Sequence, residues 1–242
     1  AIELWFQFLI SASMASQGRS AHVPGLQAQR AKAFWDEFYE SNPMSQHEWI
    51  IDSEACVAHI PCSLDAHDDP PSCLELGCGD GTLAATLADA GWRVLAVDVS
   101  PVTIEHARKT YSESEIRTRS RGSVRFEAAD AMNLPSDLLR DFGIGDGFQL
   151  IIEKGMSDTL GFRGLNREKR SLLTTFWAKV YSMLSPGGTY MIISTKSRIQ
   201  YLRASAPWAE VSPGRSVGPL DFIADVKSHS RSSKEREGQA YV

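Results

Sequence analysis

The chain has little cysteine, no excess of positive charge and no long apolar run. It holds 4 cysteines in 242 residues, without paired spacing, which argues against a disulfide framework and favours a reducing compartment. We therefore expect a cytoplasmic protein, with the mitochondrion as the alternative. The net charge of −5 gives no electrostatic footprint for nucleic acid. No run reaches the roughly 18 apolar residues that a membrane helix needs, so we expect neither a nucleic-acid nor a membrane partner.

The length and composition indicate one large domain with tails. Hydrophobic residues make up 43% of the chain, which is enough for a full core. Residues 1–30 are expected to form a flexible lead-in. The main domain is expected over 31–226, and its first part, 31–70, is expected to form a helical lid. Residues 227–242 are charged and serine-rich, and we expect a mobile tail there.

A glycine-rich turn joins a strand to a helix early in this domain. Leu74 and Leu76 are apolar strand positions, and good helix formers follow from Thr82. Between them lie three glycines, at which the backbone can turn tightly and bring bare N–H groups close to a ligand: Gly77, Gly79 and Gly81. A strand, a glycine turn and a helix N-terminus make a nucleotide-type site. The G-x-G-x-G spacing departs from the dinucleotide-binding pattern.

A second strand ends in an acid. Residues 93–99 form a nearly continuous apolar run, as expected of a buried parallel strand, and the run contains Asp98, 21 positions after Gly77. An acid at this place can accept hydrogen bonds from both ribose hydroxyls of a nucleotide. A simple strand-end acid is the alternative, and we favour ribose binding because of the glycine turn upstream.

Further strands alternate with helices along the chain. Strands are expected over 124–130, 148–153 and 189–194, with a sixth over 221–226. A helix with apolar residues on one face is expected before the fifth strand. This order predicts an α/β fold with a doubly wound, mostly parallel sheet that binds its ligands at the carboxyl ends of the strands.

The glycine turn, with Glu75 ahead of it, resembles motif I of the class I S-adenosylmethionine (SAM)-dependent methyltransferases. The resemblance implies SAM as the cofactor and a Rossmann-like sheet of seven strands. The last strand of that sheet is antiparallel, and here it would only begin at 240–242, so we expect it to be truncated. It also implies that the acid at position 130 accepts from the adenine amino group and that the next backbone N–H donates to the ring. The cofactor-binding residues that it implies are Glu75, Gly77, Cys78, Gly79, Asp98, Val99, Asp130, Ala131 and Glu153.

The segment after the fourth strand points to the reaction class. Residues 153–160 resemble the (D/E)-K-G-x-x-D-x-(L/V) signature of the eukaryotic lysine methyltransferases that modify elongation factor 1A and citrate synthase. The resemblance implies methyl transfer to a protein lysine, with a translation factor or a metabolic enzyme as the partner. We expect the chain to be a monomer or a weak oligomer. Met156-Ser157 replaces the pair common in that family, which leaves the identity of the substrate open.

Two acids in this segment are the candidate catalytic residues. We expect Glu153 to line the mouth through which the methyl group is transferred and Asp158 to position the acceptor amine. The alternative is that Lys154 pairs with one of these acids and locks the turn.

Aromatic residues ahead of the glycine turn suggest a lid. Phe34, Trp35, Phe38 and Tyr39 fall on one helical face, and with Trp49 they resemble the W-(D/E)-x-x-Y … (E/D)-W segment of several eukaryotic protein methyltransferases. This face either caps the core or covers the cofactor, and a packed lid does both. We place Trp35, Tyr39 and Trp49 at the substrate mouth. A further helix is expected over 50–60, because Pro61 would stop it.

No metal site is expected. Cys56, His59, Cys62 and His67 could be drawn as a zinc set, but their spacing matches no common zinc finger. Two other functions stay open on the same fold. One is methylation of a small molecule, and the other is a partner subunit that binds SAM without transferring the methyl group.

Overall fold

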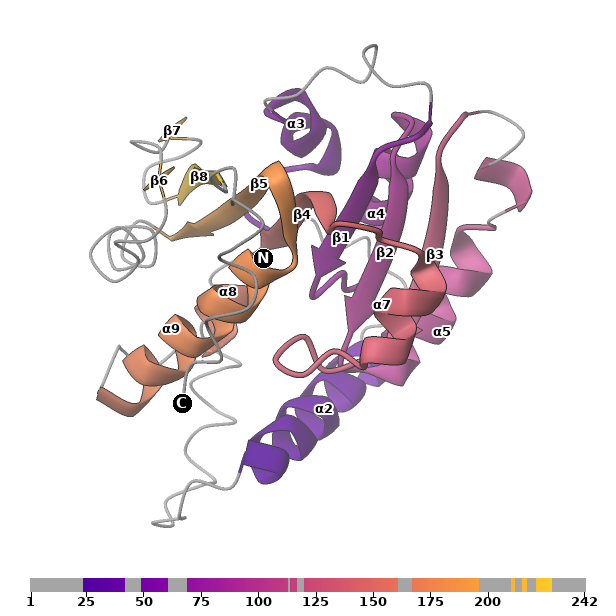
Figure 1. The fold of residues 1–242 in the computed structure, drawn as a ribbon. Helices are drawn as coiled ribbons and strands as arrows, with labels where there is room; N and C mark the ends of the chain where they lie inside the picture. The colour runs from indigo at the N-terminus through magenta and orange to yellow at the C-terminus, as the bar shows by residue number, and fades with distance from the viewer. Residues whose placement is uncertain are drawn as a thin grey trace.

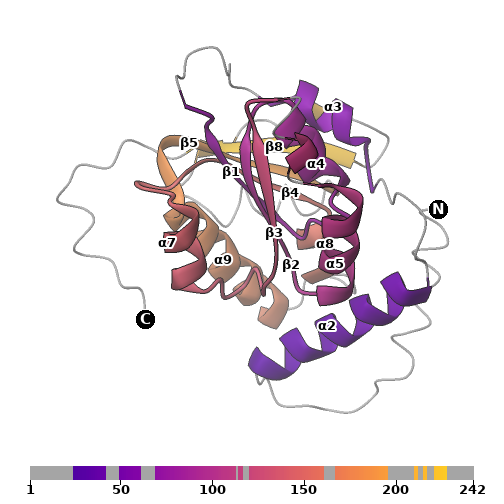
Figure 2. The same cartoon turned by 90° about the vertical axis from the view of Figure 1, so that its right-hand side faces the viewer.

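A computed structural model describes the central part of the chain and short pieces near its end. The described residues are 24–41, 49–60, 69–112, 114–116, 120–160, 167–195, 210–211, 215–216 and 221–227. They form one sheet flanked by helices on both faces (Figures 1 and 2). This is the expected doubly wound α/β fold.

The sheet is parallel over its first five strands. Its strand order is β3-β2-β1-β4-β5-β8-β6, and β7 pairs with β8. The crossover between β3 and β4 reverses the direction in which the strands are added, so the carboxyl ends of β1 and β4 flank the point where such sheets bind ligands. The strands are β1 (Ser72–Leu76), β2 (Arg93–Asp98), β3 (Ser123–Ala128), β4 (Phe148–Lys154), β5 (Leu184–Thr195), β6 (Glu210–Val211), β7 (Arg215–Ser216) and β8 (Asp221–Lys227).

The strand that follows β5 in the sheet is antiparallel. β8 pairs with β5 from Thr189↔Lys227 to Thr195↔Asp221, so the strand expected over 221–226 is confirmed. The expectation of a truncated last strand over 240–242 lies outside the described residues.

Helices cover the two faces of the sheet as the apolar patterns require. They are α2 (Pro24–Ser41), α3 (Ser53–Ala58), α4 (Thr82–Asp89), α5 (Pro101–Thr110), α7 (Ser136–Phe142), α8 (Met156–Leu160) and α9 (Arg167–Ser182). Residues of α3, α4 and α5 pack in one apolar cluster with one face of the strands, and residues of α7 and α9 pack in a second cluster with the other face. Among the described residues, no helix is both long and apolar enough to cross a membrane.

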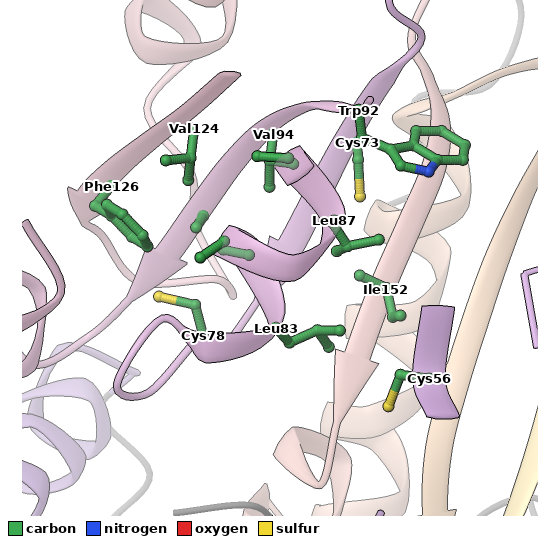
Figure 3. Packing of buried hydrophobic residues seen from close by; sticks show 14 of the residues in the cluster. Cys56, Cys73, Cys78, Leu83, Leu87, Trp92, Val94, Val124, Phe126 and Ile152 are labelled. Carbon is green, nitrogen blue, oxygen red and sulfur yellow. The ribbon is translucent and has the colours of Figure 1, made fainter. Parts of the chain in front are cut away.

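The first cluster contains side chains from alternate positions of the strands. Val94 and Ala96 of β2 belong to it, whereas Leu95 and Val97 belong to the other, as the period of two in a strand demands. Figure 3 shows Leu83 and Leu87 of α4 among the strand residues of this cluster. Because both faces of β2 are buried, its sequence is a nearly continuous apolar run.

The helices before the glycine turn differ from their expected bounds. α2 begins at Pro24, so residues 24–30 are helical where a flexible lead-in was expected, and proline suits the first position of a helix. α3 begins at Ser53 and not at residue 50, because Ile50 has a φ of +68° and the Asp52 carboxylate caps the helix by accepting from Ala55 N. Residues 1–23 and 228–242, for which we expected a lead-in and a tail, lie outside the described residues.

α2 lies across the end of the sheet toward which β1 and β2 point (Figures 1 and 2). It packs against α5. The lid helix therefore crosses the carboxyl ends of the strands, at the edge where the candidate residues gather.

Candidate functional site

The glycine turn is held against β2 by its backbone. The N–H groups of Gly77 and Cys78 both donate to the carbonyl oxygen of Val97, at 2.9 and 3.0 Å. Gly77, Gly79 and Gly81 have φ values of +71°, +52° and +84°, in the left-handed region that favours glycine. The expected strand–turn–helix geometry is confirmed.

Two of these glycines also leave no room for a side chain. A Cβ atom on Gly81 would lie 2.7 Å from the ring of Phe126 and 2.8 Å from Cβ of Ala107. A Cβ atom on Gly79 would lie 2.8 Å from the hydroxyl of Tyr39. The loop therefore needs glycine for close packing as well as for its backbone angles.

Asp98 lies directly against the glycine turn. Its Oδ2 accepts from Gly79 N at 3.1 Å and its Oδ1 accepts from Ser100 N at 2.9 Å. The side chain is buried, and this burial raises the pKa of Asp98 to about 6, although the backbone hydrogen bonds from Ser100 and Gly79 lower it. A buried carboxylate at the end of β2 is therefore in place to accept hydrogen bonds from a polar ligand in the turn.

The end of β3 adjoins the same place. Ala129 N donates to the carbonyl oxygen of Asp98 at 2.8 Å, which brings Asp130 and Ala131 next to the ribose-binding candidate. Both residues are half-buried, and Oδ1 of Asp130 accepts from Met132 N at 2.9 Å. Val99 is half-buried beside them.

The acid ahead of the glycine turn lies inside the sheet. Glu75 is buried in β1 and registers with Ala96 of β2 and Ile152 of β4. Cys78 is also buried, and this burial, with the charges of Asp98 and Glu75, raises the pKa of its thiol well above the usual range. A thiol in this state stays protonated and is not a nucleophile.

The lid helix reaches the glycine turn. The hydroxyl of Ser100 donates to Oδ1 of Asp36 at 2.6 Å, and the hydroxyl of Tyr39 lies over Gly79. Burial, with the charges of Asp98 and Asp80 added, raises the pKa of Tyr39 well above its ordinary value, so its hydroxyl stays protonated. The structure thus places Tyr39 at the cofactor loop, whereas the sequence suggested the substrate mouth.

The other two residues expected at the mouth belong to the same aromatic group. The rings of Trp35 and Tyr39 lie 6.0 Å apart between centroids, and those of Phe38 and Trp49 lie 5.9 Å apart. Phe38 is buried, whereas Trp35, Tyr39 and Trp49 are half-buried. One ring of the group therefore lies in the core, and the other three are partly accessible.

Glu153 at the end of β4 is enclosed by hydrogen-bond donors. Its Oε2 accepts from Ser157 N at 2.7 Å, and its Oε1 accepts from the hydroxyls of Ser157 and, at 2.5 Å, Tyr190. The side chain is fully buried. Burial raises the pKa of Glu153 to about 7, with a further contribution from Asp158, while the hydrogen bonds from Ser157 and Tyr190 lower it.

Asp158 follows in α8 and bonds to the neighbouring strand. It is 5% exposed, and its Oδ2 accepts from the hydroxyl of Ser194 on β5 at 2.9 Å. Lys154 donates to the carbonyl oxygen of Ile51 at 3.2 Å. The segment that precedes α3 is thereby joined to the end of β4.

The two halves of the site touch between β4 and the glycine turn. A Cβ atom on Gly77 would lie 3.2 Å from both Cβ and Cγ of Met156. Gly155 has a φ of +80°, and a Cβ atom on it would lie 3.6 Å from Cδ1 of Ile50. The segment after β4 therefore packs on the cofactor loop, as expected if the methyl donor and the acceptor meet there.

Several residues of this site were not predicted from the sequence. They are Asp36, Ser100 and Thr103 on the cofactor side, with Ser157, Tyr190 and Ser194 on the acceptor side. Thr103 donates from its hydroxyl to the carbonyl oxygen of Gly79 at 2.8 Å. In the sequence, Asp36 occupies the (D/E) position of the W-(D/E)-x-x-Y segment, and serine before proline, as in Ser100-Pro101, is typical of a helix N-cap. Among the described residues no cluster could hold a metal ion, and Cys62 and His67 lie outside them.

The residues at this edge fit SAM. The left-handed glycines leave a surface without side chains for the methionine end of the cofactor. Asp98 offers a buried acceptor for ribose hydroxyls, and Asp130 with Ala131 lies one strand further on, for the adenine. Tyr39 covers the turn and adds a protonated hydroxyl.

Comparisons with known proteins agree with this fit. Residues 73–188 match a family described as a methyltransferase domain. The eEF1A lysine and N-terminal methyltransferase of Danio rerio is 24% identical over 163 residues, which are 66% of this chain and 21% of that protein, so the chain spans only about a fifth of that relative. Protein-lysine N-methyltransferase efm4 of Schizosaccharomyces pombe is 24% identical over 193 residues, which are 71% of this chain and 77% of efm4.

Solved structures show the same fold. The 1,6-didemethyltoxoflavin-N1-methyltransferase of Burkholderia thailandensis, which was solved with 1,6-didemethyltoxoflavin and S-adenosylhomocysteine bound, has a TM-score of 0.57. It is 16% identical, and the likeness covers 88% of this chain and 93% of that one. At this identity the likeness shows the fold alone.

Proposed function

We propose that the chain is a class I SAM-dependent methyltransferase that transfers the methyl group to a lysine side chain of a protein. The observation that carries the proposal is the pair of buried acids, Glu153 and Asp158, on the segment that packs against the cofactor loop through Met156. This segment has the lysine-methyltransferase signature. Both relatives are named as lysine methyltransferases, which supports a protein partner such as a translation factor or a metabolic enzyme.

The cofactor supplies an electrophilic methyl group on a sulfonium ion. The chain has to hold the acceptor in line with that methyl group and exclude water. α2 and its aromatic residues cover the carboxyl ends of the strands. Asp36 accepts from Ser100, in the turn after β2, and the hydroxyl of Tyr39 lies over Gly79. The lid therefore serves to exclude water from the place where the two substrates meet.

A lysine acceptor has to lose a proton before it can attack, since its free pKa is about 10.4. Two acids close to the acceptor attract its ammonium group, and burial within the site then favours the neutral amine. We assign Asp158, which is 5% exposed, to orient the incoming amine. We assign Glu153, whose pKa of about 7 allows it to be ionised or protonated near neutral pH, to pass the proton on.

A small-molecule acceptor is the second candidate. The half-buried rings of Trp35, Tyr39 and Trp49 could form the wall of a closed aromatic pocket, and fold does not decide the substrate. An inactive partner subunit would bind SAM and transfer nothing.

Radiolabelled SAM separates these functions. The chain is incubated with a cell extract that has been divided by dialysis into a protein fraction and a small-molecule filtrate, beside a Gly79→Arg variant that cannot accommodate a side chain at the turn. We expect label in a discrete protein band, absent with the variant. Label only in the filtrate would favour the small-molecule acceptor. No label in either fraction, with SAM binding intact by calorimetry, would favour the inactive partner.

A further inference from the structure

The two acids on the acceptor side are each held by a hydroxyl from the same strand. Tyr190 donates to Oε1 of Glu153 at 2.5 Å, and Ser194 donates to Oδ2 of Asp158 at 2.9 Å. Tyr190 and Ser194 stand four positions apart on β5, so their side chains project from the same face. Both are buried.

Neither hydroxyl belongs to the segment that carries the acids. Glu153 ends β4 and Asp158 lies in α8, whereas both donors come from β5, 37 and 36 residues away in the chain. β5 is itself fixed on both sides, because Tyr190 registers with Ile151 of β4 and with Val226 of β8. The donors therefore stand on a rigid element between two paired strands.

Rigid donors can hold an acid in one orientation. We propose that Tyr190 and Ser194 are positioning residues for methyl transfer, which fix the carboxylates of Glu153 and Asp158 toward the acceptor amine. The inference rests on the proposed function, because it requires these acids to act on the acceptor. It assigns to β5 a part in the reaction that neither the glycine turn nor the signature after β4 predicts.

In the hydrogen bond between Tyr190 and Glu153, the tyrosine hydroxyl is the donor. Burial and the charge of Glu153 raise the pKa of Tyr190 well above its ordinary value, so the phenol keeps its proton and donates. The groups that face Glu153 are Ser157 and Asp158 of α8, Tyr190 of β5 and, across β1, the uncharged Leu76. The hydroxyls of Tyr190 and Ser157 favour the ionised carboxylate, whereas burial and Asp158 oppose it.

The variant Tyr190→Phe removes only the hydroxyl and keeps the buried ring. We expect kcat for the protein acceptor to fall about tenfold, as for the loss of a hydrogen bond to a charged group, with little change in the affinity for SAM. The acidic limb of the pH profile of kcat is expected to move to higher pH, because loss of the donor raises the pKa of Glu153. Ser194→Ala is expected to lower kcat by a similar factor.

Matched controls remove hydroxyls outside this network. Tyr181→Phe on α9 deletes the hydroxyl of a half-buried tyrosine, and Ser182→Ala deletes an exposed hydroxyl that donates to the carbonyl oxygen of Lys179. Both controls should keep the wild-type kcat and pH profile. A kcat of Tyr190→Phe equal to that of Tyr181→Phe would show that the hydroxyl is merely structural and would overturn the inference.

A readout without turnover separates this inference from the proposed function. Carbon-13 NMR of glutamate carboxyl groups follows the titration of Glu153, and its pKa should rise in Tyr190→Phe and stay unchanged in Tyr181→Phe. An unchanged pKa of Glu153 in Tyr190→Phe contradicts the inference, whatever the substrate.

If the wild-type chain methylates only small molecules, the proposed function fails alone. The same loss of kcat with a small amine then supports the inference. If it methylates nothing, both fail.

Discussion

The hydroxyl of Ser100, in the turn after β2, donates a hydrogen bond of 2.6 Å to Oδ1 of Asp36 on α2, 64 residues earlier in the chain. Ser100 also accepts from Thr103 N as the N-cap of α5, and it donates its own backbone N–H to Asp98. One buried serine therefore links the lid helix to the carboxylate that we assign to the ribose. We therefore expect the affinity for the cofactor to depend on this contact.

Asp36→Ala tests the contact between the lid and the turn. Because the variant leaves the hydroxyl of Ser100 without its partner on α2, the affinity for SAM should fall severalfold, and amide exchange over 24–41 should become faster. Calorimetry and hydrogen exchange measure the two effects. The matched control is Glu37→Ala, at an exposed neighbouring position, which should change neither. Equal effects of the two substitutions would mean that the contact between Ser100 and Asp36 does not hold the lid.

Gly81→Ala and Gly143→Ala form a pair that separates crowding from backbone strain. Both glycines have positive φ, at +84° and +71°, so alanine costs about 1–2 kcal/mol at either position. Only Gly81 is crowded, by Phe126 and Ala107, and Gly143 has nothing within 4 Å. Overpacking should add about 1–3 kcal/mol at Gly81, measured by denaturant unfolding, and should also weaken SAM binding. A similar loss of stability in both variants would contradict the close packing of the turn.

The affinity for SAM should depend on pH through Asp98. Its pKa of about 6 means that the carboxylate is ionised at neutral pH and becomes protonated below about pH 6, where it loses acceptor strength toward ribose hydroxyls. Calorimetry should therefore show the affinity falling as the pH decreases through 6. Asp98→Asn should bind SAM about tenfold more weakly at pH 7.5, in line with the loss of a charged acceptor, and should lack this pH dependence. A wild-type affinity that stays constant from pH 7 to pH 5 would argue against the role of Asp98.

Glu153→Gln should stabilise the fold while it removes activity. Burial raises the pKa of Glu153 from 4.5 to about 7, so the native state binds a proton more tightly than the unfolded chain. This acid therefore costs stability increasingly as the pH rises from about 4.5 to 7. Above pH 7 the variant should be more stable by about 3 kcal/mol, an order-of-magnitude figure from this rise in the pKa, and below pH 4.5 the difference should vanish. Unfolding at pH 8 and pH 4.5 measures both, and a variant less stable at pH 8 would contradict the buried charge.

The local pattern of the chain predicted the strand ends but not the contacts between them. The glycine turn, Asp98 and the segment after β4 follow from residues that are close in sequence, because strand length and turn chemistry are local. The donors to Glu153 and Asp158 come from β5, and the partner of Ser100 comes from α2. Such pairs depend on the order and register of the strands, which no single stretch of sequence contains.

The same reasoning explains the places where the expected bounds were wrong. The helix expected from residue 50 starts at Ser53, because Ile50 takes a left-handed conformation beside Gly155, and that contact is long-range. β8 is antiparallel to β5, and the short apolar run of β8 does not reveal its direction. Tyr39 lies over Gly79 for a similar reason, since a helical face by itself does not indicate what it will cover.

The most direct test of lysine methylation is the chemical identity of the methylated residue. The chain is incubated with tritiated SAM and the protein fraction of a cell extract, beside Gly79→Arg, and the labelled band is hydrolysed to amino acids. We predict methylated lysine as the labelled product, absent with the variant. Label in any other amino acid, or label that stays soluble in acid and never enters the protein band, would contradict it.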